Sequence, residues 1–146
     1  LIHQFLITQK TTMKQILTIV AACLMALVAV SCGKGNTPTG VAEKSIECLQ
    51  KKDFEGYSKL MYYNDTLTGD KLKSEQEAMA GMLQSKYASS LEQKGEITGY
   101  RVVSEEVSDS SAVVKMRVAY EKADSTSESV KLRLNKKGEW RISMGK

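Results

Sequence analysis

The sequence predicts an α+β domain in which three N-terminal helices pack on the concave face of a curved four-stranded antiparallel sheet. Between residues 39 and 93 the apolar side chains recur every three or four positions, as they do on one face of a helix. Beyond Gly95 they recur at every second position, which is typical of strands that are buried on one side. Helices first and strands afterwards favour a sheet whose helices all lie on the same face.

The first two predicted helices follow each other closely along the chain. Residues 39–52 form the first helix, with Thr39 as its N-cap. Asp53 caps the second, short helix, because an aspartate side chain accepts hydrogen bonds from the open N–H groups of a first helical turn. The apolar faces of the two helices are formed by Ala42, Ile46 and Leu49, and by Phe54, Tyr57, Leu60 and Met61.

A capping box predicts where the third helix begins. Ser74 and Glu77 have the spacing at which the serine side chain binds the N–H of the glutamate and the glutamate reaches back to the serine. The helix is expected to run to about Gln93 and to end at Gly95. Its apolar face consists of Met79, Met82, Leu83, Tyr87 and Leu91.

Four strands with short connections are expected after the helices. Residues 97–107 form the first, with an irregularity at Gly99, and residues 112–120 form the second. The turn Asn135–Gly138 joins the last two strands as a hairpin. The residues expected on the buried face are Ala112, Val114, Met116, Val118, Tyr120, Val130, Leu132, Leu134, Trp140, Ile142 and Met144. The opposite, solvent-facing side carries the cations Lys115, Arg117, Lys131, Arg133 and Arg141.

The order of these motifs resembles a known fold. The segments that carry the resemblance are TGVAEKSIECLQKKDFEGY, VVSEEVSD and the closing GEWRISMGK. They resemble the cone-shaped, cystatin-like superfamily fold of nuclear transport factor 2, ketosteroid isomerase and scytalone dehydratase. More narrowly, the chain is similar to small lipoproteins of Bacteroides-type bacteria whose domain of unknown function is akin to lumazine-binding-like proteins. The resemblance covers residues 38–146 and implies a cavity between the helices and the sheet.

The segment before the domain predicts a lipoprotein signal peptide. Lys14 precedes an apolar run from Ile16 to Val30, and the small residue Ser31 lies directly before Cys32. The run is shorter than the roughly 20 apolar residues that a bilayer core requires. We therefore expect cleavage before Cys32 and attachment of palmitate-type acyl chains to this cysteine.

Four segments follow from this interpretation. They are an upstream extension in residues 1–12, the signal peptide in residues 13–31, a lipidated cysteine with a flexible tether in residues 32–40, and the α+β domain in residues 41–146. The lipid would anchor the protein to a membrane of the bacterial cell envelope. No acidic residue follows Cys32 closely, which favours the periplasmic face of the outer membrane over surface display.

Composition argues against several classes of function. The chain has 21 Lys+Arg and 17 Asp+Glu, a net charge of +4, and no basic run with interleaved aromatic residues. A nucleic-acid partner is therefore not expected. The only histidine, His3, precedes the signal peptide, and Cys48 is expected to be a small buried residue. With so few soft ligands we expect no metal site, and we assign no cofactor.

Several residues are candidates for lining the implied cavity. They are Asp53, Tyr57, Tyr87, Met116, Tyr120 and Trp140. Asp53 and Tyr57 are one helical turn apart, and the enzymes that the chain resembles use an aspartate or histidine base with tyrosine or acid partners. A structural role explains these residue types equally well, because an aspartate at this position caps the helix and tyrosines pack well in a core. We therefore assign no catalytic residue.

Three functions stay open at this point. The leading hypothesis is non-enzymatic binding of a small ligand or an envelope partner protein. The alternatives are an isomerase, dehydratase or hydrolase that uses the cavity, and a cystatin-like inhibitor or assembly module. The methionines either fill a tapering core or line an adaptable apolar pocket. These residues, all expected to face the core, are Met61, Met79, Met82, Met116 and Met144.

Overall fold

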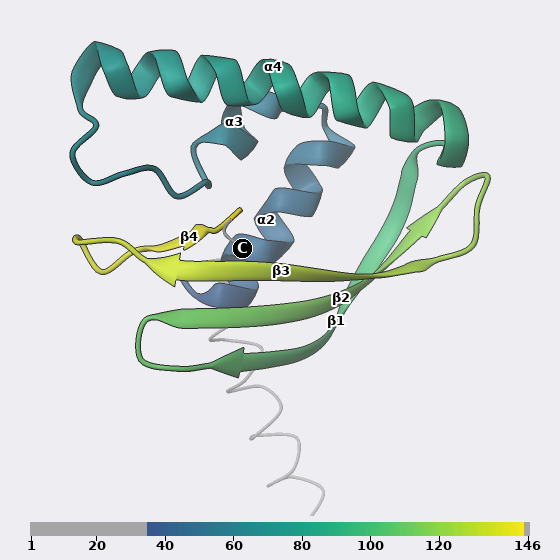
Figure 1. Cartoon of the computed structure of the whole chain (residues 1–146). Coiled ribbons are helices and arrows are strands. Elements are labelled where there is room, and N and C mark those ends of the chain that lie inside the picture. The colour runs from purple at the N-terminus through teal and green to yellow at the C-terminus, as the bar shows by residue number, and fades with distance from the viewer. Residues whose placement is uncertain (1–34, 145–146) are drawn as a thin grey trace, which may run out of the picture. The chain divides into compact units, whose positions relative to one another are not determined.

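The computed structural model describes residues 35–144, shown in colour in Figure 1. The predicted signal peptide, Ser31, Cys32 and the beginning of the tether lie outside the described residues. The described part contains three helices followed by four strands, so the predicted α+β order is confirmed. None of the helices between residues 35 and 144 has the length and apolar character that crossing a membrane requires.

Helix α2 extends from Pro38 to Gln50, and its N-cap is Thr37. The Thr37 hydroxyl oxygen accepts a hydrogen bond of 3.0 Å from the backbone N–H of Gly40. The prediction of Thr39 as the N-cap was wrong, because proline is favoured at the first helical position, where its missing N–H needs no partner. The helix therefore includes the end of the segment that was expected to be a tether.

Helix α3, Phe54–Ser58, is the short second helix. Its cap is Asp53, as predicted, and Asp53 Oδ1 accepts a hydrogen bond of 2.9 Å from the N–H of Gly56. A long connection then leads to α4. In this connection Tyr62 N–H donates to the carbonyl of Ile142 and Ile142 N–H donates to the carbonyl of Leu60, both at 2.8 Å. The segment after α3 thus pairs with the outer edge of the last strand.

Helix α4 extends over 26 residues from Gly69 to Lys94. The predicted start at the Ser74–Glu77 capping box was wrong, because no helix breaker stands between Gly69 and Ser74 and Asp70 complements the partial positive charge of the first turn. The predicted end is confirmed, since Gly95 adopts φ +74°, a backbone conformation that favours glycine.

The sheet has the strand order β1-β2-β3-β4, and neighbouring strands are antiparallel. The strands are β1 Ile97–Val107, β2 Ser111–Tyr120, β3 Thr126–Leu134 and β4 Trp140–Ile142. The predicted irregularity at Gly99 is present as a register shift in β1, and a second shift follows Val102. Figure 1 shows that α2 lies across one face of the sheet and that α4 runs above the edge of β3.

The core lies between α2, the end of α3 and the inner face of the sheet. Its strand residues Ala112, Val114, Met116, Val118, Leu132 and Ile142 are all buried, as the alternating pattern predicts. Cys48 is also buried, which confirms its prediction as a small core residue, and this burial raises the pKa of its thiol. Met144 is an exception, because it follows the end of β4 and is 59% exposed. The prediction that Met144 faces the core was therefore wrong.

The start of the described chain is fastened to the last strand. The side-chain amide of Asn36 donates to the carbonyl of Trp140 at 3.1 Å, and the N–H of Trp140 donates to the side-chain oxygen of Asn36. This reciprocal pair joins residues 104 positions apart in the sequence. It fixes the position from which α2 begins relative to β4.

Candidate functional site

A cavity of about 560 Å³ lies between the helices and the inner side of the sheet. Its volume falls within the roughly 300–1,000 Å³ that is usual for small-molecule sites. Most of its wall is apolar, and the lining residues come from α2, α3, α4 and all four strands. The apolar lining residues are Ile46, Leu49, Met61, Leu83, Ile97, Val118, Val130, Ile142 and Met144. A ligand in this cavity would bury an apolar body against both layers of the fold.

Two hydroxyl groups lie together in the helical wall of the cavity. Ser45 is 1% exposed and its hydroxyl donates to the carbonyl of Ala42 at 2.6 Å. The Ser45 side chain is also a hydrogen-bond partner of the Tyr57 hydroxyl. Burial raises the pKa of Tyr57 above its ordinary value, and the hydrogen bond to Ser45 only partly opposes this effect. At neutral pH Tyr57 is therefore a neutral phenol and a poor general base. Because the Ser45 hydroxyl proton goes to the Ala42 carbonyl, the Tyr57 O–H donates to the Ser45 oxygen, and the phenol oxygen can accept a hydrogen bond.

The mouth of the cavity carries charged groups. Lys94 at the end of α4 places its Nζ 5.0 Å from the ring centroid of Tyr120. Lys131 and Glu128 lie on β3, where the Glu128 carboxylate accepts a 2.8 Å hydrogen bond from the hydroxyl of Thr126. Glu128 is the single carboxylate among the described lining residues. The site thus combines a mainly apolar interior with two ammonium groups and one carboxylate among its lining residues.

Two of the residues proposed from the sequence line this cavity, namely Tyr57 and Tyr120. Asp53 does not line it: the side chain is exposed and caps α3. Met116 is 1% exposed and lies within the core, away from the cavity lining. An aspartate base next to the tyrosines, which the enzyme hypothesis requires, is therefore not assembled here.

The other two candidates have structural roles. Tyr87 is buried against Phe54 with ring centroids 5.7 Å apart, and its hydroxyl donates to Glu96 Oε2 at 3.4 Å. Burial raises the pKa of Tyr87, and the Glu96 charge adds to this effect. Trp140 begins β4 and its backbone is held by Asn36. Neither side chain is among the residues that line the cavity.

Sequence reasoning missed Ser45, Leu83 and Lys94 as cavity residues. Ser45 had a detectable signal, because it is a polar residue next to Ile46 on the face of α2 that otherwise carries Ala42 and Leu49. A buried hydroxyl on an apolar helix face needs a hydrogen-bond partner, which here is partly the hydroxyl of Tyr57. Lys94 had no such signal, since only the packing of the α4 C-terminus against Tyr120 brings it to the entrance.

The role of Asp53 can be tested by two substitutions. Asp53→Ala is expected to lower the free energy of unfolding by about 1 kcal/mol, because the N–H of Gly56 loses its acceptor. Asp53→Asn is expected to leave stability nearly unchanged, since asparagine caps helices as well as aspartate does. Urea denaturation of the two variants measures the difference. If Asp53→Asn were as destabilising as Asp53→Ala, the negative charge and not the cap would be the important property.

The helices covering one face of a four-stranded antiparallel sheet, with a cavity between the two layers, define a nuclear transport factor 2-like fold. A candidate NTF2-like transpeptidase from Campylobacter jejuni shares it, with a TM-score of 0.59 and 12% identity over 75% of this chain and 99% of that one. The likeness shows the fold and carries no activity with it.

Two further structures have similar folds. A protein with a SEC-C motif from Rhodopseudomonas palustris matches with a TM-score of 0.53 and 14% identity, over 76% of this chain and 78% of its own. A candidate calcium/calmodulin-dependent protein kinase type II association domain from Thiobacillus denitrificans matches with a TM-score of 0.51 and 13% identity. The match covers 73% of this chain and 89% of that one. No protein-family model and no curated protein matches the sequence.

Proposed function

We propose that this chain is a non-enzymatic binding protein whose cavity takes a small, mainly apolar molecule with one anionic or hydrogen-bonding end. The observation that carries the proposal is the cavity of about 560 Å³ with a mainly apolar wall, the hydroxyls of Ser45 and Tyr57 together in that wall, and Lys94 at the entrance. The apolar body of the ligand gains about 25 cal/mol for each Å² that leaves water. Tyr57 and Lys94 orient its polar end.

The chemistry of the wall supports binding over catalysis. A general acid or base needs a group whose pKa lies near the working pH. The raised pKa of Tyr57 moves this phenol further from neutrality. Asp53 is outside the cavity, and Glu128, the single carboxylate among the described lining residues, is exposed to solvent. The polar end of the ligand is therefore held by hydrogen bonds and by the positive charge of Lys94.

Blocking the cavity tests this proposal. The probe is 1-anilinonaphthalene-8-sulfonate, an apolar anion, titrated into the purified chain by calorimetry. Leu83→Trp fills part of the cavity from α4, and we expect it to weaken binding about tenfold or more, or about 1.4 kcal/mol. Met82→Trp is the matched control, because Met82 is also half-buried on α4 but does not line this cavity.

The outcomes of this titration are distinct. Weaker binding in Leu83→Trp alone supports a ligand site between the helices and the sheet. Equal weakening in both variants would mean that the probe binds elsewhere on α4. The proposal would be abandoned if the unmodified chain bound neither the probe nor any member of a panel of lipids and metabolites.

We also propose that lipid on Cys32 anchors the chain to the bacterial outer membrane, with the domain on the periplasmic side. This proposal rests on the sequence, where Ser31 and Cys32 end an apolar run. Two or three acyl chains give stable anchoring, because each buried methylene contributes about 0.8 kcal/mol. In that position the cavity would take ligands that are present in, or released from, the envelope.

A further inference from the structure

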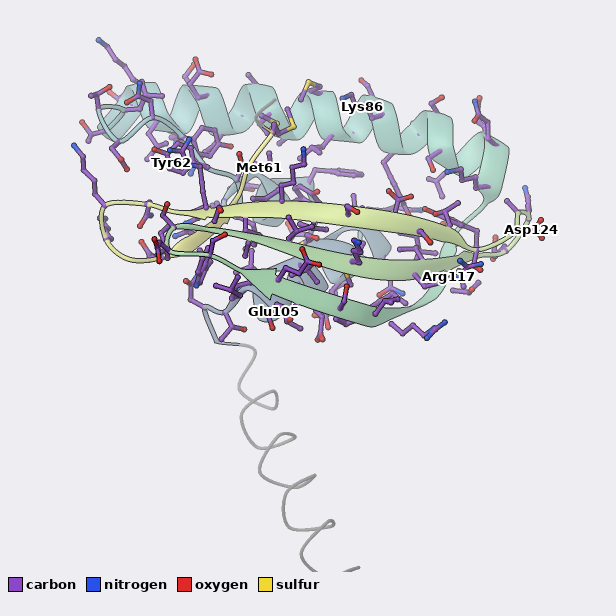
Figure 2. All side chains as sticks on the ribbon, turned by 60° about the horizontal axis from the view of Figure 1, so that its bottom comes forward. Met61, Tyr62, Lys86, Glu105, Arg117 and Asp124 are labelled. Atoms are coloured by element: carbon purple, nitrogen blue, oxygen red, sulfur yellow. The ribbon has the colours of Figure 1, made fainter. Side chains whose placement is uncertain are left out.

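A second cavity, of about 540 Å³, lies on the side of the molecule where α4 begins. Its walls are the connection between α3 and α4, the first turns of α4 and the hairpin between β3 and β4. Figure 2 shows Tyr62, one of its lining residues, at this end, whereas Arg117 and Asp124 lie at the opposite end. Met61 is the single residue that lines both cavities, so the second is a separate site.

Hydrogen bonds hold both walls of this second cavity in place. In the hairpin, Asn135 Oδ1 accepts from the N–H of Lys137 at 3.0 Å and from the N–H of Glu139 at 2.9 Å. In the α3–α4 connection, Asn64 Oδ1 accepts from the N–H of Thr66 at 3.0 Å. Arg141 Nη1 donates to the carbonyl of Lys59 at 3.0 Å and so joins the two walls. The hairpin therefore presents its lysines from a fixed backbone.

The charges around this cavity are predominantly positive. The lining has four cations, Lys59, Lys136, Lys137 and Arg141, and two carboxylates, Asp65 and Glu139. Both carboxylates have partners already: Arg141 pairs with Glu139 at 2.8 Å, and the Tyr62 hydroxyl donates to Asp65 at 3.3 Å.

Lys136 and Lys137 form no ion pair within residues 35–144. A further cation lies against the lining residue Tyr62, because Arg133 places its guanidinium 4.1 Å from the centroid of that ring. The local field therefore favours a ligand with at least one full negative charge.

We propose that this second cavity binds a small molecule through its phosphate group. The ammonium groups of Lys136 and Lys137 act as point charges on the phosphate oxygens, which is how lysine recognises phosphate. Thr68, Gln76 and Tyr62 supply polar side chains for the rest of the molecule, and the Thr68 hydroxyl makes no capping bond to α4. The phosphate belongs either to a free phosphomonoester or to a phospholipid headgroup.

The test uses glycerol 3-phosphate and vesicles that contain phosphatidylglycerol, added separately to the purified chain. Lys136→Gln with Lys137→Gln is expected to weaken binding about tenfold or more. The matched control is Lys86→Gln with Lys115→Gln, two exposed lysines outside both cavities that change the net charge equally. We expect this control to change binding less than about twofold, because salt screens distant surface charges.

The two probes also distinguish the source of the phosphate. Binding of glycerol 3-phosphate indicates a free metabolite, and binding of vesicles alone indicates a headgroup. Amide resonances of Tyr62 and Gly138 should shift, whereas that of Ser45 in the first cavity should not. The proposal is overturned if neither probe binds, if both double variants weaken binding equally, or if the shifts centre on Ser45.

Discussion

Replacing Met116 by alanine is expected to lower the free energy of unfolding by about 2–5 kcal/mol. Met116 is 1% exposed and is the largest fully buried side chain in the described part of the chain. Its removal leaves a void between α2 and the sheet that the surrounding side chains fill only partly. Because the free energy of unfolding of natural domains is only about 5–15 kcal/mol, this substitution would remove a large part of the stability of the domain. Chemical denaturation monitored by circular dichroism measures the change.

Met144→Ala is the matched control for this prediction. Met144 is 59% exposed, so its truncation should change the free energy of unfolding by less than about 0.5 kcal/mol. Comparing the two variants tests whether the methionines fill a tapering core or line an adaptable apolar pocket, the two interpretations that the sequence leaves open. A small effect at Met116 would show that the core around it is loosely packed, and the adaptable-pocket interpretation would then apply to β2 as well.

Cys32→Ser is expected to abolish membrane attachment through lipid. Without the thiol no diacylglycerol can be added, and a lipoprotein signal peptide is then not cleaved. The variant should therefore accumulate as a larger precursor that carries no palmitate label. Electrophoresis of cells grown with labelled palmitate measures both the size and the lipid. The expected loss of label is complete, because Cys32 is the single attachment point that this proposal provides.

Cys23→Ser provides the control, since it makes the same substitution within the apolar run. This variant should be cleaved, labelled and retained in the membrane fraction. If Cys32→Ser instead ran at the mature size and partitioned into the aqueous phase of a detergent separation, the chain would carry an ordinary secretory signal peptide.

The strands were predictable because their pattern is local and repeated. Ala112, Val114, Met116 and Val118 alternate with exposed residues, and the turn at Asn135–Gly138 sets the register of the strands that it joins. Helix starts were less predictable, because serine and threonine occur at several positions that could serve as caps. The pair Thr37–Pro38 decided the start of α2, and the Ser74–Glu77 motif lies inside α4.

The cavity was predictable in its position but only partly in its residues. Tyr57 and Tyr120 are on faces that periodicity identifies, and they line it. Tyr87 is also on an apolar helix face, yet it packs against Phe54, because the axis of α4 is set by its contact with α3. Spacing along a sequence gives the direction of a side chain around its own helix. It does not give the angle at which that helix crosses its neighbours.

The reciprocal bonds between Asn36 and Trp140 determine how the domain responds to mechanical load. A pull on the chain that precedes residue 35 reaches Asn36 before it reaches α2, and the load passes directly to β4. Each bond contributes only about 1 kcal/mol, so this attachment yields before the packed helix does. We therefore expect these two hydrogen bonds to break before the packing of α2 against the sheet is lost.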